Sequence, residues 1–242
     1  SLLDEWNSGL IEKQLLSYMF RVNYDYNNKY LLTVSGRWDG ASQLAEGNKW
    51  AFFPSAALGW RLDQEEFLKD VTWLNQLKFR LGVGVTGNSA IDPYQTKGAI
   101  VSLYYPFGSA LAPGYAASEP LIKDGAVAMA NKNLSWEKTT QYNIGLDYSV
   151  LNGRISGVLD FYTSRTTDLL MAMTIPSLNG YTNTYANVGK TSNIGVDITL
   201  NTVNVKTRDF EWSTSINAAW QKDKIDELAN GKEDDINNNW FI

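Results

Sequence analysis

The stretch from Leu16 to Asp39 reads LSYMFRVNYDYNNKYLLTVSGRWD and decides the fold class. Up to residue 26 the even-numbered positions are all apolar or aromatic, whereas the odd ones are polar apart from Met19. A polar turn, Asn27–Lys29, follows, and the alternation resumes from Tyr30 onward. Because alternation with a period of two places apolar side chains on one face of a strand, this stretch predicts a β-hairpin.

The same alternation recurs further along the chain, so eight strands are expected in total. They cover residues 16–26, 30–39, 52–62, 77–86, 140–150, 154–162, 194–200 and 210–220. Most are about ten residues long, whereas strands of soluble domains typically have about five or six. A tilted membrane-spanning strand needs about 9–11 residues. The lengths therefore favour an all-β, antiparallel transmembrane β-barrel over the alternative, a soluble β-sandwich.

The connections between these strands are either short or long. Short links cover 27–29, 151–153 and 203–209, and long links cover 39–49, 87–138 and 163–191. Short periplasmic turns and long extracellular loops are typical of bacterial outer-membrane barrels. Aromatic residues fit two interfacial belts, which are Tyr24, Tyr26, Tyr30, Trp60, Tyr148, Phe210 and Trp212 near short links, and Trp38, Trp50, Phe52 and Trp220 near long ones.

One connection of intermediate length, residues 63–76, has a helical pattern. Asp63 and Glu66 have the spacing of a capping box, and Phe67, Val71 and Leu74 follow at helical spacing. We therefore expect one short amphipathic helix here, with Glu65 and Glu66 in its first turn, where negative charge is favoured.

Composition excludes several functions. The 242 residues include no His and no Cys, which rules out a Ser-His-Asp or Cys-His nucleophile, a thiolate zinc site and a disulfide framework. The formal net charge of -5 argues against a nucleic-acid partner. No run of 18 apolar residues and no signal peptide occur, and the chain does not begin with Met. We therefore expect the chain to be part of something longer.

Motifs for other chemistries are weak. Gly82-x-Gly84-x-x-Gly87 matches a dinucleotide fingerprint by spelling, but no helix start follows it. The run Glu233-Asp234-Asp235 lacks the full spacing of a calcium loop, so a solvated loop is the simpler interpretation. A glycosidase would require two carboxylates facing each other across a cleft. We expect no enzymatic activity, no catalytic residue, no bound metal and no cofactor.

Two groups of residues are candidates for contact with a solute or partner. Charged side chains on the polar strand face would line a barrel lumen, and they are Arg21, Asp25, Arg37, Asp39, Arg61, Arg80 and Asp147. An aromatic-rich tract in the longest link could stack on a sugar or pack against a partner, and its members are Tyr104, Tyr105, Phe107 and Tyr115. Packing within its own loop is the alternative for this tract. A secreted sandwich that holds glycan with it is the alternative function.

Several longer strings resemble one known family along nearly the whole chain. They are RVNYDY from Arg21, RWDGAS from Arg37, GNKW from Gly47, FPS from Phe53, GWR from Gly59, GVTGN from Gly84, NLSWE from Asn133, YNIGLD from Tyr142, DLL from Asp168, NVGK from Asn187 and NWFI from Asn239. In this order they are similar to the SusC/RagA-type TonB-dependent outer-membrane transporters of the Bacteroidetes.

The resemblance implies more than the strand pattern does. The fold would be a barrel of about 22 strands closed by a plug domain, of which residues 1–242 supply about eight strands and neither the plug nor the TonB box. The protein would lie in the bacterial outer membrane and import oligosaccharide or peptide nutrients. Its implied partners are a SusD-like surface lipoprotein and the TonB-ExbB-ExbD complex, which would act through the plug. No catalytic residue is implied.

Overall fold

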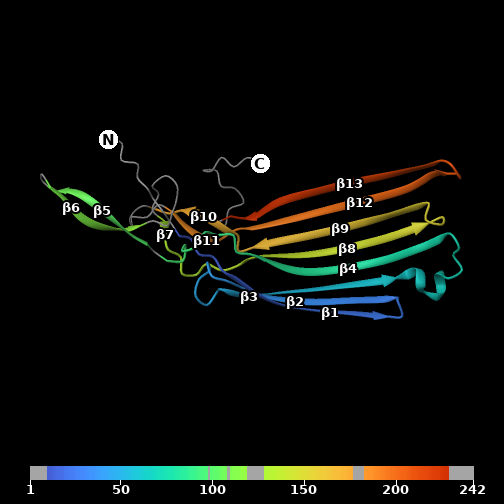
Figure 1. Cartoon of the computed structure of the whole chain (residues 1–242), viewed down its shortest axis with the longest axis horizontal. Coiled ribbons are helices and arrows are strands. Elements are labelled where there is room, and N and C mark those ends of the chain that lie inside the picture. The colour runs from blue at the N-terminus through green and yellow to red at the C-terminus, as the bar shows by residue number, and fades with distance from the viewer. Residues whose placement is uncertain (1–9, 98, 108–109, 119–127, 177–182, 229–242) are drawn as a thin grey trace.

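The computed structural model describes residues 10–97, 99–107, 110–118, 128–176 and 183–228. Within 98–128 only the backbone is described, and elsewhere in these ranges the side chains are described as well. Its main feature is an antiparallel sheet of eight strands in the order β1-β2-β3-β4-β8-β9-β12-β13 (Figure 1). These strands are β1 (Leu15–Tyr26), β2 (Tyr30–Ala41), β3 (Trp50–Arg61), β4 (Leu74–Asn88), β8 (Glu137–Val150), β9 (Ile155–Thr167), β12 (Lys190–Lys206) and β13 (Glu211–Glu227). The prediction of eight long antiparallel strands is confirmed.

Five shorter strands belong to the connections. In the β4–β8 connection, β5 (Ala99–Phe107) pairs with β6 (Ala110–Ser118), and β7 (Ala128–Met129) follows. In the β9–β12 connection, β10 (Leu170–Thr174) pairs with β11 (Asn183–Asn187), which also pairs with β7. These elements lie at one end of the large sheet, and the short turns lie at the other (Figure 1). We name these ends the loop end and the turn end.

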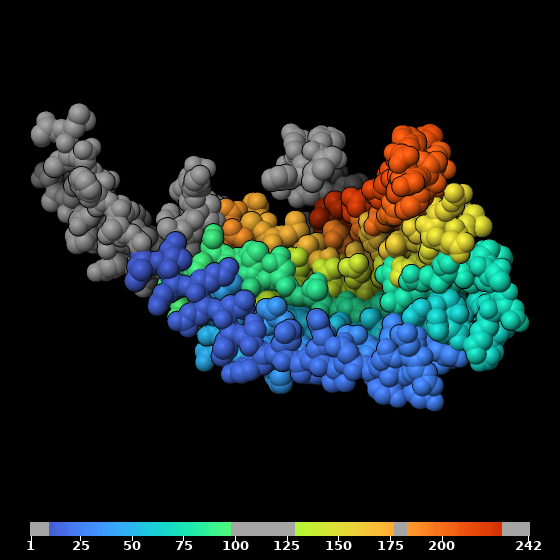
Figure 2. Space-filling view, turned by 45° about the vertical axis from the view of Figure 1, so that its right-hand side comes forward, coloured from blue at the N-terminus to red at the C-terminus, as the bar shows by residue number. Residues whose placement is uncertain are grey.

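The register places the apolar side chains on one face of the sheet. Ile198 of β12, for example, lies opposite Leu159 of β9 and Ala218 of β13. This face stays open to the surroundings, with Phe20 and Leu58 each 54% exposed. The two smaller sheets lie at or beyond the loop end rather than on this face (Figure 1), and successive strands follow one another across the molecule (Figure 2). A sandwich would cover such a face with a second sheet, so the sandwich interpretation is wrong.

Aromatic rings on the apolar face gather towards both ends of the sheet. At the turn end Tyr30 stacks on Tyr26 and on Trp60, with ring centroids 6.5 Å apart in both pairs. At the loop end Tyr18 stacks on Trp50 at 6.1 Å, and Trp38 meets Phe52 at 6.3 Å. Two bands of amphipathic rings with aliphatic residues between them are the pattern of a membrane barrel.

The hairpin turns form where the sequence predicts them. Asn27 and Asn28 have φ values of 53° and 56°, and the Lys29 N–H donates to the Tyr26 carbonyl at 3.0 Å. Two consecutive residues at positive φ are the requirement of a type I′ turn, which asparagine tolerates well. The β8–β9 turn has positive φ at Asn152 and Gly153, as the Asn-Gly signal predicts.

The prediction of a short amphipathic helix in the 63–76 link is wrong. The segment forms two 3-10 turns, Leu62–Gln64 and Glu66–Leu68, and Leu74 already begins β4. No side-chain cap closes either turn. The carboxylate of Glu65 instead accepts hydrogen bonds from the neighbouring strands, and Phe67 is exposed. Because Asp63 and Glu65 are both engaged outside the segment, local capping cannot hold a helix of this length together. Among the described residues, no helix has the length and hydropathy to cross a membrane.

Glu65 holds this link against the aromatic band of the turn end. Its carboxylate accepts from the Tyr30 hydroxyl at 2.7 Å, from the Trp60 indole at 3.0 Å and from the Lys29 ammonium at 3.3 Å. The hydrogen bond from Tyr30, followed by that from Trp60, lowers the pKa of the Glu65 carboxyl. The link is therefore tied to both β2 and β3 by one side chain.

We expect this contact to loosen on acidification. Because the folded pKa of Glu65 is lowered, the contribution of this contact to stability is complete above the ordinary glutamate pKa and disappears as the pH falls through the lowered value. Fluorine NMR of fluorotryptophan at Trp60, assigned with Trp60→Phe, should show a titration with a midpoint below that ordinary value. Glu65→Gln should abolish it, and an unchanged titration in this variant would contradict the assignment.

The last two long strands extend well past their predicted ends. β12 and β13 each span 17 residues, compared with the expected 194–200 and 210–220. The additional residues, at both ends of β12 and at the C-terminal end of β13, are mostly polar. They remain extended because ladder hydrogen bonds form regardless of side-chain type, and a bulge near Val203 absorbs a register shift. Alternation of apolar residues therefore predicts the part of each strand that carries the apolar band, and it underestimates the length of the whole strand.

The most completely buried residues lie in the loops at the loop end. Leu134 is 0% exposed and Trp136 is 4% exposed, and Trp136 meets the ring of Phe53 edge-on at 5.3 Å. The buried apolar residues of this group are Ala41, Leu44, Phe53, Ile91, Leu134 and Trp136. They come from the end of β2, from β3, and from the β2–β3 and β4–β8 connections. We name this group the loop cluster.

Hydrogen bonds fasten the same loops to one another. The Trp136 indole donates to the Lys49 carbonyl at 2.9 Å, and the Ala45 N–H donates to the Leu134 carbonyl at 3.1 Å. The amide of Asn187 accepts from the Ser135 N–H at 2.8 Å and donates to the Ser135 carbonyl at 2.9 Å. Three connections that are far apart in sequence thus form one packed unit.

Candidate functional site

The seven charged candidates share the polar face of the sheet. The register pairs Arg21 with Ser35, and Arg37 with Met19 and Phe53, on the face opposite to Ile198 and Phe20. In the same way Arg80 lies opposite Gly59 on β3 and Gly145 on β8. The full set on this face is Arg21, Asp25, Arg37, Asp39, Arg61, Arg80 and Asp147. Along the strands these residues fall into three groups with different surroundings.

Three of the candidates meet at the loop end. Arg21, Arg37 and Asp39 line a hollow of about 560 Å³ between β1, β2, β3 and β4. Arg37 donates from Nε to Asp39 Oδ1 at 2.6 Å and from Nη2 to Ser17 Oγ at 3.2 Å. Because Asp39 is nearly buried and neutralised by Arg37, the hollow carries the positive charge of Arg21. It suits a ligand or protein segment that offers an anion or a carbonyl group.

Arg80 and Asp147 form a second group with Asp160. The Arg80 guanidinium donates from Nε to Asp147 Oδ1 at 2.9 Å, and from Nη2 to both oxygens of Asp160 at 3.0 and 3.1 Å. This contact joins β4, β8 and β9. Gly145 makes it possible, because a Cβ there would lie 2.6 Å from the Arg80 guanidinium carbon. Asp160 was not among the predicted residues, although its position on the polar face follows from the alternation in 154–162.

We expect Arg80→Gln to lower the free energy of unfolding by about 1–2 kcal/mol, because it leaves two carboxylates facing each other without a cation. Adding Asp160→Asn should recover part of the loss. Urea unfolding in lipid vesicles, followed by tryptophan fluorescence, measures the change. A midpoint unaffected by Arg80→Gln would show that this group does not stabilise the sheet.

Asp25 and Arg61 lie apart from the others, at the turn end. Asp25 Oδ1 accepts from the Asn28 N–H at 2.8 Å, and Arg61 donates to Asp63 Oδ2 at 2.7 Å. Both side chains therefore stabilise the connections next to them.

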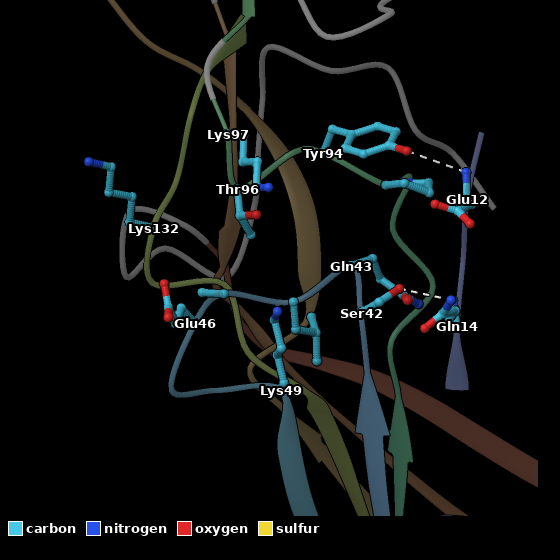
Figure 3. Close-up of a pocket in the computed structure, with 13 residues that line it drawn as sticks. Glu12, Gln14, Ser42, Gln43, Glu46, Lys49, Tyr94, Thr96, Lys97 and Lys132 are labelled. Atoms are coloured by element: carbon cyan, nitrogen blue, oxygen red, sulfur yellow. Dashed lines mark hydrogen bonds between the residues drawn. The ribbon is translucent and has the colours of Figure 1, made fainter. Parts of the chain in front are cut away.

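A larger hollow lies among the connections of the loop end (Figure 3). It has a volume of about 820 Å³ and is lined by the lysines Lys49, Lys97 and Lys132 and by the acids Glu12 and Glu46. The Glu12 N–H donates to the Tyr94 hydroxyl at 3.4 Å, and the Gln14 N–H donates to Ser42 Oγ at 2.9 Å. The strand pattern did not predict this hollow, because its residues come from connections and from the segment before β1, which carry no periodic signal.

The aromatic candidates of the longest link lie on the β5–β6 hairpin. The backbone register places Tyr104 opposite Pro113 and Ser102 opposite Tyr115. Tyr105 and Phe107 also belong to β5. This hairpin extends away from the large sheet at its loop end (Figure 1). The side chains of Tyr104, Tyr105, Phe107 and Tyr115 lie outside the described part of the chain, as do Glu233, Asp234 and Asp235.

The long strands, the banded apolar face and the charged polar face together define a transmembrane β-barrel wall. Comparison with known proteins agrees with this. The family model described as "TonB dependent receptor-like, beta-barrel" matches residues 5–240. The chain therefore belongs to the TonB-dependent receptor β-barrel family, whose members are proteins of the outer membrane.

Individual relatives point the same way. The chain is 41% identical to the TonB-dependent receptor SusC of Bacteroides thetaiotaomicron over 96% of its own length and 23% of the relative. Its structure resembles the RagAB peptide importer in the open-open state, with a TM-score of 0.80, 29% identity, and coverage of 91% of this chain and 23% of that one. The siderophore receptor PirA from Pseudomonas aeruginosa, at 16% identity and a TM-score of 0.53, shares the fold.

The chain spans about a quarter of the length of these first relatives. The expected resemblance to SusC/RagA-type transporters is confirmed, and the relatives are receptors and transporters rather than enzymes.

Proposed function

We propose that this chain is part of the barrel wall of a transporter that imports oligosaccharides or peptides across the outer membrane with energy supplied through TonB. The observation that carries the proposal is the sheet itself, whose eight strands present one banded apolar face and one charged face. Membership of the TonB-dependent receptor family supports it. The likeness to the RagAB peptide importer supports peptides as one class of cargo. Oligosaccharides are the other class that the resemblance of the sequence to SusC/RagA-type transporters implies.

The remaining domains and strands of the transporter would come from parts of the protein other than residues 1–242. Within the described residues, the edge strands β1 and β13 each pair on one side only, so further strands would have to pair with them to close a barrel. We propose that residues 1–242 all belong to the barrel domain, and that a plug domain and the other strands complete the transporter. A SusD-like lipoprotein would cover the loop end, and the TonB-ExbB-ExbD complex would act on the plug.

We assign the described residues as follows. The polar face lines the lumen, where Arg21, Arg37 and Asp39 contact the plug or the cargo near the loop end. The Arg80 group holds three strands of the wall together. The loop cluster keeps the outer connections in a fixed shape, so that the hollow around Lys49 and the β5–β6 hairpin can meet the cargo or the lipoprotein.

An uptake assay with intact cells tests the proposal. Cells with and without the complete protein are given a panel of labelled oligosaccharides and peptides, before and after a protonophore collapses the inner-membrane gradient. We expect accumulation of at least one cargo that needs both the protein and the gradient. Uptake that survives the protonophore would indicate a passive pore and contradict the proposal.

A further inference from the structure

Five basic residues gather on the apolar face of the sheet, next to the loop end. They lie on β8, β9, β12 and β13 and are Lys138, Arg165, Lys190, Lys222 and Lys224. We name this group the basic band. Charge on a face that meets lipid is costly at the centre of the bilayer and acceptable only near its surfaces, so its position needs a physical reason.

The register fixes the position of the basic band relative to the apolar residues. Arg165 lies opposite Ser192, which lies opposite Lys224, and Ile194 lies opposite Lys222. One step further from the loop end, Ile144, Phe161, Val196 and Trp220 form a continuous apolar row. The basic band thus begins where the apolar row ends, directly beyond the ring of Trp220. Rings of this kind mark the level of the lipid headgroups.

Acidic neighbours neutralise only part of the basic band. Lys190 pairs with Glu227 at 2.5 Å, and Lys224 lies 3.6 Å from Asp226, which also accepts from the Ser192 hydroxyl at 3.1 Å. Within the described part of the chain, no ion pair includes Lys138, Arg165 or Lys222. All three side chains are exposed. The band therefore carries an excess of positive charge.

The other half of the sheet has no such group. At the same end and on the same face, β1, β2 and β3 present Leu16, Tyr18, Trp38, Trp50 and Phe52. A general need for charge at the membrane surface would distribute lysine around the whole wall. Since the charge is restricted to one sector of four adjacent strands, a localised anion is the better explanation.

We propose that the basic band binds the anionic, phosphate-bearing headgroup of a lipid in the outer leaflet. Lys and Arg are the side chains suited to phosphate oxygens, and the apolar row below them would pack against the acyl chains. The long stems of Lys138 and Lys222 reach the headgroup while their methylene groups stay on apolar surface. This inference rests on the membrane placement in the proposed function, but not on any cargo.

Native mass spectrometry of the complete protein in detergent, with dioleoylphosphatidic acid as the probe, tests this proposal. The variant Lys138→Gln, Arg165→Gln, Lys222→Gln removes the three charges without a described partner. We expect it to bind the probe at least about tenfold more weakly than the wild type. Dioleoylphosphatidylcholine should bind weakly to both proteins. The matched variant Lys49→Gln, Lys97→Gln, Lys132→Gln removes three charges from the loops at the same end and should retain the wild-type affinity.

Two further measurements keep the test decisive. If the Gln variant does not fold, as judged by its heat-modifiable mobility on a gel, a photo-crosslinkable phosphatidic acid on the wild type should label peptides of β9 and β13. Labelling spread evenly over the wall would overturn the proposal. So would equal affinity of wild type and variant, or of the two lipids. Failure of cargo uptake would leave these binding results unaffected, so the two proposals fail separately.

Discussion

Trp136→Ala is expected to lower the stability of the loop cluster by about 3–5 kcal/mol, the range for truncating a large buried aromatic residue. Trp136 is almost fully buried, meets Phe53 edge-on and donates its indole N–H to the Lys49 carbonyl. The truncation therefore removes packing and leaves a carbonyl group without its donor. The three connections would therefore separate from one another.

Amide hydrogen exchange of the loop peptides measures the loss of stability in the loop cluster itself. Peptides that cover 41–49 and 131–137 should exchange much faster in Trp136→Ala, since the Ala45 N–H depends on the Leu134 carbonyl. Trp38→Ala is the matched control, because Trp38 is 54% exposed on the apolar face and makes its edge-on contact with Phe52 outside the loop cluster. Equal exchange in wild type and Trp136→Ala would show that the cluster does not hold the loops.

Ile198→Lys is expected to prevent stable insertion into a membrane, at a cost of about 2–4 kcal/mol. Ile198 lies at the middle of β12, 41% exposed, between Leu159 and Ala218 on the apolar face. A lysine here would have to reach about half the thickness of the hydrocarbon layer to find water. Urea titration in lipid vesicles measures the free energy, and the heat-modifiable gel shift measures the folded fraction.

The neighbouring residue provides the control. Thr199 points to the opposite face, where it lies between Val158 and Asn217 and donates to Asn217 at 3.0 Å. Thr199→Lys places the same charge one residue away but on the polar face, and should cost less than about 1 kcal/mol. If both lysines were equally harmful, the assignment of the two faces would be wrong.

The sequence predicted correctly those elements in which the type of each residue depends on its own surroundings or on its own backbone conformation. Leu16, Tyr18 and Phe20 alternate with polar residues because only one side of a strand meets lipid. Asn27, Asn28 and Gly153 mark turns because few residues adopt a positive φ. These preferences are local, so they can be read from neighbouring positions in the chain.

The incorrect helix shows the limit of such local reasoning. Asp63, Glu66 and Phe67 have the spacing of a capped helix, but Glu65 is held by Tyr30 and Trp60 from other strands. These tertiary hydrogen bonds outweigh a weak local preference, since an isolated helix of this length is unstable in water.

Interactions between distant segments required the tertiary structure. Asp160 became a partner of Arg80 only when β4, β8 and β9 lay side by side, and the loop cluster joins Ala45 to Leu134. The sequence motifs NLSWE and NVGK, which contain Trp136 and Asn187, resemble the family. No periodicity in the sequence, however, indicated that these two residues hold the loops together.

The amino-acid sequence alone thus determined long antiparallel strands with one apolar and one polar face. Strand length and the family resemblance favoured lipid as the surroundings of the apolar face, since a tilted membrane-spanning strand needs about 9–11 residues. The tertiary structure decided which charges neutralise one another, how the loops pack, and that five basic residues from four strands meet beyond Trp220. The physical reason is register: adjacent strands bring together residues that are many positions apart, and no local preference encodes that distance.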